Sequence, residues 1–289
     1  MDRSAYYTVS HPDKFSFDWK GFYDKIERLT DATREKTPNL LDVPYSNGDN
    51  PKQRLDVYFA QENKETKHPV FIFLHGGGFV EGDKDDYGFV ARPFSLNGIV
   101  TVVCSYRWAP QSHYPAQVDD TRSILTWVYK NIGRYGGDSD RIFIGGHSAG
   151  AILCASVSVN SSWTKGYKEI PRDVVKGFFA ISGLYDLRGS FLADPYIADS
   201  SLLVEASPIL NLVDPPSSIV AVGSKEKDVF LKPSKDFIEE LGKKSSNLKK
   251  SQATPKLLIL DNMDHADTVL TLGDENSLLF RELLEEMAT

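Results

Sequence analysis

The chain has 289 residues and the composition of an ordinary globular protein, with 41% hydrophobic and 25% charged residues. Its formal net charge of −7 argues against a nucleic acid or an anionic membrane as partner, because both favour basic surfaces. No apolar run approaches the roughly 18 residues that cross a bilayer, and residues 1–10 lack the apolar segment of a secretory signal. We therefore expect a cytoplasmic protein that acts on a small molecule, and α/β folds often reach this length as a single domain, here 1–289.

Short apolar runs alternate with longer helical patterns from residue 54 onward. Several of the runs consist almost entirely of Val, Ile, Leu and Phe, as expected for strands buried on both faces of a parallel sheet. The predicted strands are 55–59, 70–74, 99–104, 141–145, 177–181, 218–222 and 256–260, and the predicted helices are 118–135, 149–159, 234–241 and 278–287. This alternation predicts an α/β fold with a mostly parallel, doubly wound sheet.

Two segments lie outside the alternation. Residues 1–40 form an arm rich in aromatic side chains, and residues 184–216 form a long insertion after a predicted strand. One interpretation is that both form a small cap that covers the active edge of the sheet and lines a pocket. The alternative is that the first is a docking arm and the second an ordinary excursion of the chain.

The segment GHSAG at 146–150 fits the pattern G-x-S-x-G. It follows an apolar run and opens a helical pattern of small residues, which is the context of a nucleophilic serine on a strained strand-to-helix turn. The flanking glycines relieve crowding at such a turn. Ser148 is therefore the predicted nucleophile, and we expect the adjacent His147 to direct its side chain elsewhere.

The segment HGGG at 75–78 directly follows another predicted strand. Backbone N–H groups in a glycine-rich loop can stabilise the oxyanion of a tetrahedral intermediate, and we expect those of Gly77, Gly78 and Ala149 to form this hole. The alternatives are a simple glycine-rich turn or a phosphate-binding loop. No G-K-[ST] follows the glycines, which favours the oxyanion hole.

A nucleophilic serine needs a base and an acid that orients the base. His265 follows the last predicted strand and precedes the final helix, which matches the chain order Ser, acid, His of serine hydrolases with this arrangement. His75 is expected to orient its own glycine loop. The acid should follow the strand at 218–222, where Glu226 and Asp228 both stand, and either carboxylate could hold the imidazole.

Metal or cofactor chemistry finds no support in the sequence. The chain contains no H-E-x-x-H segment and its two cysteines are isolated. We therefore expect neither a metal site nor a cofactor.

These motifs resemble those of known α/β-hydrolases. HGGG at 75–78 together with GHSAG at 146–150 is similar to the hormone-sensitive-lipase-like esterases. A closer resemblance, from about residue 30 to the C-terminus, is to the kynurenine formamidases, or arylformamidases. It rests on DVPY at 42–45, DVYF at 56–59, GHSAGA at 146–151, SGLYDL at 182–187, SP at 207–208, the acid loop through SKDF at 234–237, and MDH at 263–265.

The resemblance implies an α/β-hydrolase fold and release of formate from N-formylkynurenine. It also implies that the catalytic acid is Glu226, where the family usually has Asp. The loop at 75–79 reads HGGGF where the formamidases usually have H-G-G-x-W, and is similar to that of general esterases. Three hypotheses follow: an arylformamidase-like enzyme, a carboxylesterase or lactam and natural-product hydrolase, and, more remotely, a non-catalytic ligand-binding protein on this fold.

Overall fold

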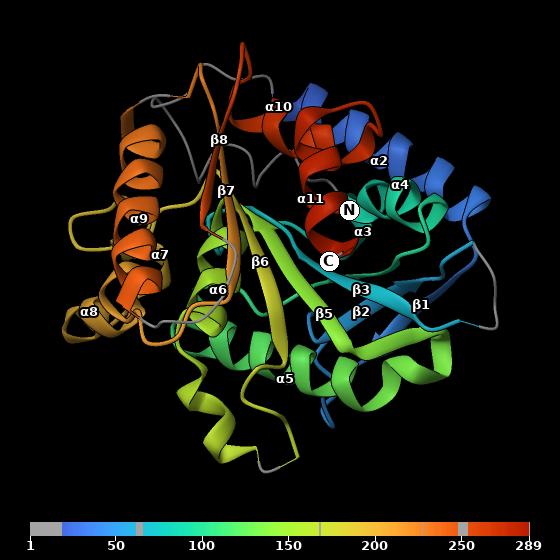
Figure 1. The fold of residues 1–289 in the computed structure, drawn as a ribbon, viewed down its shortest axis with the longest axis horizontal. Helices are drawn as coiled ribbons and strands as arrows, with labels where there is room; N and C mark the ends of the chain where they lie inside the picture. The colour runs from blue at the N-terminus through green and yellow to red at the C-terminus, as the bar shows by residue number, and fades with distance from the viewer. Residues whose placement is uncertain (1–18, 62–65, 168, 227, 248–253, 289) are drawn as a thin grey trace.

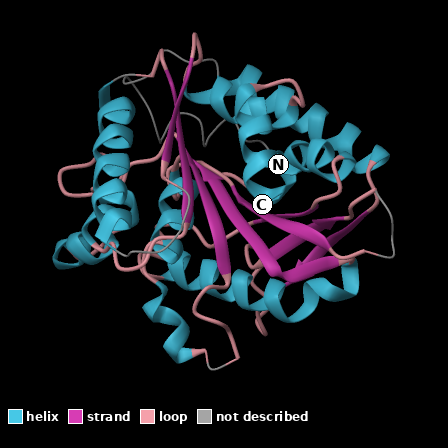
Figure 2. Ribbon diagram, viewed as in Figure 1, coloured by secondary structure: helices cyan, strands magenta, loops and turns pink. Residues whose placement is uncertain are grey.

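The computed structural model describes residues 19–61, 66–167, 169–226, 228–247 and 254–288. Within them an eight-stranded sheet has the order β1-β2-β4-β3-β5-β6-β7-β8, with helices on both faces (Figures 1 and 2). The strands are β1 (Asn39–Pro44), β2 (Arg54–Tyr58), β3 (His68–Leu74), β4 (Val100–Cys104), β5 (Gly137–His147), β6 (Val175–Ile181), β7 (Ser217–Gly223) and β8 (Lys256–Leu260). Strand β2 pairs antiparallel with β1 and β4, and all other pairs are parallel. The predicted α/β fold is confirmed, with all seven predicted strands in place.

Strand β3 shows why the sheet is buried on both faces. Its side chains alternate, so that Val70, Ile72 and Leu74 enter one hydrophobic core while Phe71 and Phe73 enter the other. A strand that serves two cores has no polar face, which accounts for the continuous apolar run in the sequence.

The helices divide between the two cores. Helices α5 (Ala116–Asn131), α6 (Ala149–Ser158) and α9 (Asp228–Asn247) cover one face, and α4 (Ala91–Leu96), α10 (His265–Leu270) and α11 (Leu278–Ala288) cover the other (Figure 1). The remaining helices are α2 (Trp19–Lys36), α3 (Lys84–Tyr87), α7 (Ala193–Tyr196) and α8 (Leu203–Ala206). Short 3₁₀ turns are η1 (Gly88–Val90), η2 (Ile132–Tyr135), η3 (Ser161–Gly166), η4 (Ser200–Leu202), η5 (Pro208–Leu210) and η6 (Thr271–Gly273). Among the described residues, no helix combines the length and apolar character needed to span a membrane.

Two elements near the N-terminus were not predicted from the sequence. Strand β1 is an edge strand that exposes Leu40 and Leu41, so it lacks the alternation of a half-buried strand. Helix α2 lies within the aromatic arm and buries Phe22, Tyr23 and Ile26 beside α3 and α4. Residues 1–18 of the arm lie outside the described residues, so their part in a cap stays a prediction.

A buried ion network joins α2 to the sheet. The Arg34 guanidinium lies 3.0 Å from an oxygen of Asp56 on β2, and Lys84 Nζ lies 3.1 Å from the other oxygen. Burial raises the pKa of Asp56, and the two cations oppose that rise. Asp42 and Asp85 complete a cluster of three carboxylates around these cations. Buried pairs of this kind fix geometry more than they add net stability.

The order of the strands creates a crevice between β3 and β5. The chain passes from β3 to β4 on one side, and from β5 to β6 on the other, so the connections diverge at this point. In open α/β sheets, sites form outside the carboxyl ends of the strands at such a switch. Leu74 pairs with Gly146, which sets the loop after β3 beside the turn after β5.

Candidate active site

Ser148 lies on the turn between β5 and α6. Its φ of 55° and ψ of −116° are rare for a residue with a side chain and cost of order 1–3 kcal/mol. The turn is held by close packing, because a Cβ at Gly150 would lie 2.2 Å from the carbonyl oxygen of Leu74 at the end of β3. This is the geometry of a nucleophile elbow.

The glycine loop after β3 lies against this serine. A Cβ at Gly76 would be 3.2 Å from Ser148 Cβ, and the following residues Gly77, Gly78 and Phe79 all have positive φ, between 58° and 116°. In the described part of the chain, the N–H groups of Gly77, Gly78 and Ala149 donate to no protein acceptor. N–H groups that lack a protein acceptor, in a loop that lies against a serine, are able to bind an anionic oxygen.

His75 and its neighbours hold the loop from below. Its Nδ1 donates to the carbonyl oxygen of Gly76 at 2.6 Å, and its ring stacks on Tyr106 with centroids 4.3 Å apart. Tyr106 in turn donates its hydroxyl to the carbonyl oxygen of His75 at 2.8 Å. Burial lowers the pKa of His75 to about 4, so the ring is neutral at pH 7. His75 thus contacts its own loop, as the sequence analysis expected.

Glu81 is a buried acid behind the same loop. Its N–H donates to the carbonyl oxygen of Gly77 at 3.0 Å, and the residue is only 9% exposed. Burial, and then the charge of Asp86, raise the pKa of Glu81 to about 7, while a hydrogen bond with Tyr23 of α2 opposes the rise. No local sequence pattern indicates a buried acid at this position, because the burial of Glu81 depends on α2 packing over it.

The structure brings Glu226, and not Asp228, to His265. Glu226 Oε2 lies 2.7 Å from His265 Nδ1, and the Glu226 side chain is completely buried. Asp228 is exposed and begins α9. His265 is the first residue of α10, where the Asp264 side chain caps the helix by accepting from the N–H groups of Ala266 and Asp267.

Ser182 is a residue that sequence reasoning missed. It follows β6 with a φ of 54°, and its hydroxyl donates to Glu226 Oε1 at 2.5 Å. The N–H of Gly223 donates to the same oxygen at 2.8 Å. Both oxygens of the carboxylate therefore have donors, and the acid cannot rotate without losing one. The only sequence signal was that SGLYDL at 182–187 matched the resembling family, without a role for the serine.

His147, which precedes Ser148 in the chain, is the residue of this turn that contacts His265. No hydrogen bond joins Ser148 Oγ to His265 Nε2 within the described residues; such bonds are often long in the absence of substrate. The His147 ring instead lies 4.6 Å from that of His265, and its Nε2 donates to the carbonyl oxygen of His265 at 2.8 Å. As expected, the His147 side chain makes no hydrogen bond to Ser148 among the described residues; its ring points toward α10.

The insertion at 184–216 reaches both halves of the site. Phe230 of α9 stacks on His265 with centroids 4.3 Å apart, and Phe191 of the insertion packs edge-on against Phe230. Tyr196 stacks on Phe79 at 3.7 Å, and Leu192 Cδ2 lies 3.6 Å from the position of a Cβ at Gly78. Side chains of this segment therefore contact the glycine loop directly and reach His265 through Phe230.

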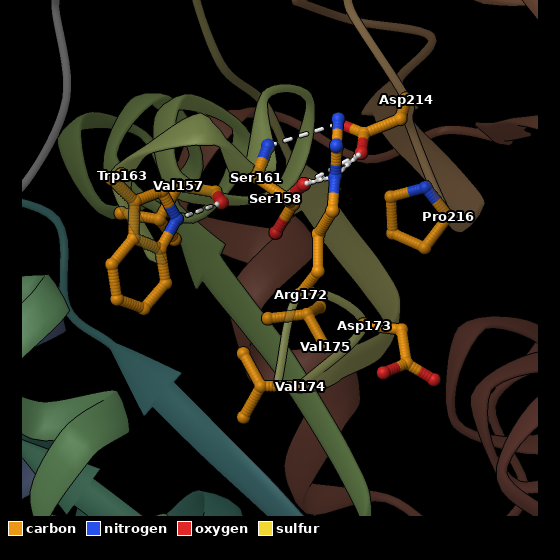
Figure 3. Close-up of a pocket in the computed structure, with 10 residues that line it drawn as sticks. All are labelled: Val157, Ser158, Ser161, Trp163, Arg172, Asp173, Val174, Val175, Asp214 and Pro216. Carbon is orange, nitrogen blue, oxygen red and sulfur yellow. Dashed lines mark hydrogen bonds and ion pairs between the residues drawn. The ribbon is translucent and has the colours of Figure 1, made fainter. Parts of the chain in front are cut away.

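A cavity of about 530 Å³ lies at the other end of α6, about 15 Å along the helix from Ser148. Figure 3 shows the Arg172 side chain reaching toward Ser161 and Asp214 across this cavity. Arg172 Nε donates to Ser161 Oγ at 2.8 Å and to Asp214 Oδ2 at 2.9 Å. None of the predicted site residues lines the cavity, so it is separate from the candidate active site.

Comparisons with known proteins relate the chain to hydrolases. The model of the BD-FAE family matches residues 55–241. A kynurenine formamidase from Danio rerio is 30% identical over 260 residues, which cover 89% of this chain and 84% of that protein. Esterase LipC from Mycobacterium tuberculosis is 30% identical over 139 residues, covering 48% of this chain and 34% of the esterase. Among solved structures, a truncated carbohydrate esterase from gut microbiota has a TM-score of 0.74 at 17% identity, covering 88% of this chain and 97% of that one.

The raised pKa of Glu81 predicts a pH-dependent effect of Glu81→Gln on stability. A carboxyl with a folded pKa of about 7 and an unfolded value near 4.5 destabilises the fold progressively as pH rises between these values. The Gln side chain does not ionise, so the variant avoids this loss. Its free energy of unfolding relative to wild type should therefore rise by on the order of 1–3 kcal/mol between pH 5 and pH 8. Urea unfolding at both pH values measures the difference. Glu27→Gln, on the exposed side of α2, is the control. A difference in free energy of unfolding between Glu81→Gln and wild type that stays constant with pH would contradict the prediction.

Proposed function

Because the chain belongs to the BD-FAE family of hydrolases, related to kynurenine formamidases and esterases, we propose that it is a serine hydrolase with Ser148 as nucleophile. The reaction cleaves a small amide or ester through an acyl-enzyme. The observation that carries the proposal is the 2.7 Å hydrogen bond between His265 Nδ1 and buried Glu226, in a base that lies beside the strained turn of Ser148.

The hydrogen bond to Glu226 sets the tautomer of the base. A carboxylate can only accept, so His265 Nδ1 carries a proton and the lone pair of the neutral ring is on Nε2. Nε2 is then ready to take the proton of the Ser148 hydroxyl as Oγ attacks the substrate carbonyl. The imidazolium that forms is stabilised by the negative charge of Glu226, whose other oxygen is fixed by Ser182.

The remaining steps follow from the same groups. The carbonyl oxygen becomes an oxyanion that accepts hydrogen bonds from the N–H groups of Gly77, Gly78 and Ala149. The intermediate collapses, His265 gives its proton to the departing amine or alcohol, and Ser148 is left acylated. Water then loses a proton to His265 as its oxygen attacks the acyl-enzyme carbonyl. When this second intermediate collapses, the bond to Ser148 Oγ breaks, the acid is released, and His265 returns the proton to Oγ.

An aryl formamide is the first candidate substrate. The similarity to a kynurenine formamidase extends over most of both chains, and a formyl group needs almost no acyl space. Leu192 and Tyr196 of the insertion pack against the glycine loop, which supports a site with little room for a long acyl chain. We propose that residues 184–216 form the wall of the site that limits the length of the acyl chain.

A carboxylesterase acting on a short ester or a lactam is the second candidate. The loop sequence HGGGF at 75–79 favours it, because the formamidases usually carry H-G-G-x-W. The partial similarity to an esterase supports the same reading. On charge and sequence we further propose a small-molecule substrate, no nucleic-acid partner, and a cytoplasmic location that cell fractionation would test.

The first prediction concerns the nucleophile. Ser148→Ala should lower kcat by on the order of 10⁶ without unfolding the protein, because the acyl-enzyme cannot form. A fluorophosphonate probe should label wild type and not the variant. Ser156→Ala is the matched control, since Ser156 lies on the same helix and, within the described residues, its hydroxyl bonds only to the carbonyl oxygen of Ile152. Labelling of Ser148→Ala, or activity within tenfold of wild type, would exclude Ser148.

The second prediction separates the two candidate acids. In Glu226→Gln the amide oxygen is drawn to the donors Ser182 and Gly223, and its NH₂ group then faces His265 Nδ1. The ring must take the other tautomer, whose Nε2 cannot accept a proton, so kcat should fall by roughly 10³ to 10⁴.

Two companion variants complete this comparison. Asp228→Asn changes an exposed carboxylate away from His265 and should leave kcat within about threefold. Glu226→Asp keeps the charge and loses only reach, so its activity should lie between those of wild type and Glu226→Gln. If Asp228→Asn were the inactive variant, the assignment of Glu226 would be wrong.

The third prediction concerns substrate choice. N-formylkynurenine should be cleaved with a kcat/KM well above that of short nitrophenyl esters, and rate should fall steeply from acetyl to butyryl and longer esters. A formate-release assay run beside a chain-length series of esters makes the comparison. Efficient turnover of butyryl esters without formate release would favour the esterase instead.

A further inference from the structure

His147 touches both the base and the glycine loop of the proposed site. It is the last residue of β5 and is only 4% exposed. Its Nε2 lies 2.8 Å from the carbonyl oxygen of His265, and the two rings are 4.6 Å apart at an angle of 44°. On the loop side, a Cβ at Gly76 would be 2.9 Å from His147 Nδ1. The ring thus fills the space between two elements that are far apart in the sequence.

The chemistry of these contacts fixes the protonation of the ring. A carbonyl oxygen can only accept, so Nε2 carries the proton. Burial, and then the neighbouring His265, hold the pKa of His147 well below its usual value, so the ring is neutral. Nδ1 is therefore an acceptor, and it has no hydrogen-bond partner among the residues that the structure describes. An unpaired buried acceptor costs about 1–3 kcal/mol, a cost that an apolar side chain at this position would avoid.

His265 is held by contacts from several elements. It is the first residue of a helix of six residues, α10. Glu226 fixes Nδ1 and Phe230 packs on the ring. Its carbonyl oxygen accepts from His147 Nε2 and, at 2.9 Å, from the hydroxyl of Thr268 within α10. The hydrogen bond from His147 Nε2 thus joins this carbonyl oxygen to β5, the strand that directly precedes Ser148.

We propose that His147 is a positioning residue, whose Nε2–H bond to the His265 carbonyl oxygen holds the base at the correct distance from Ser148 and the glycine loop. This inference rests on the proposed function. His147 neither takes a proton from substrate nor touches the reacting atoms. Its effect is on the orientation of His265, and therefore on kcat more than on KM.

The test compares two substitutions at this position. His147→Leu keeps an apolar body but removes the donor, and should lower kcat by about 10–100-fold while KM changes less than about threefold. His147→Gln places an amide N–H near the position of Nε2 and should recover kcat to within about fivefold of wild type. Circular dichroism and urea unfolding verify that both variants fold. Should His147→Leu fail to fold, His147→Asn, whose amide is too short to reach the carbonyl, should show the same loss of kcat.

A double variant distinguishes positioning of the base from a general loss of structure. If His147 and Glu226 both act by orienting His265, His147→Leu in the Glu226→Gln background should cost less than about threefold more. Full additivity of the two losses would overturn the inference, as would wild-type kcat in His147→Leu. Failure of His147→Gln to recover activity in a folded protein would also overturn it.

Comparing the His147 variants with Ser148→Ala separates this inference from the proposed function. If Ser148→Ala retained turnover and fluorophosphonate labelling, the serine mechanism itself would be wrong. If Ser148→Ala were inactive but His147→Leu had wild-type kcat, only the role of His147 would be wrong.

Discussion

The contact between the start of α6 and the end of β3 is the constraint on which the rest of the site depends. Because Gly150 lies against the carbonyl oxygen of Leu74 with no space for a Cβ, the helix begins directly above the sheet and Ser148 takes a strained conformation. The same contact fixes the distance between the serine and the loop that follows β3. The N–H groups of Gly77 and Gly78 in the loop and of Ala149 at the start of α6 have no protein acceptor among the described residues.

The proposed acid and base, Glu226 and His265, are held by a second set of contacts, across three further elements. Glu226 follows β7, accepts from Ser182 after β6, and pairs with His265 at the start of α10. The parallel order β5-β6-β7 places these chain segments at one edge of the sheet. A glutamate serves here because its carboxylate is fixed at both oxygens, so the extra methylene adds little freedom.

Two segments outside the sheet, the insertion at 184–216 and helix α2, contact the candidate site. The insertion between β6 and β7 brings Leu192 and Tyr196 against the glycine loop, and Phe191 against the ring that stacks on His265. On the other face, α2 brings Tyr23 to Glu81 behind the same loop. The α/β-hydrolase fold supports many reactions, so the side chains that these segments bring to the site bear on which substrate it accepts.

The sequence by itself determined the fold class, the strands of the parallel sheet, and Ser148 and His265 as the candidate pair. Those features follow from local causes: strands buried on both faces are apolar throughout, and a serine on a tight turn needs glycines around it. The sequence left Glu226 and Asp228 as equal candidates on residue chemistry, and it missed α2, β1, Ser182 and the direction of the His147 ring. Each of these depends on contacts between residues tens of positions apart, such as the 44 residues between Ser182 and Glu226 or the 118 between His147 and His265. Only the tertiary structure decides such contacts, because a hydroxyl or an imidazole acquires its partner when strands pair and helices pack, and no local pattern specifies that partner.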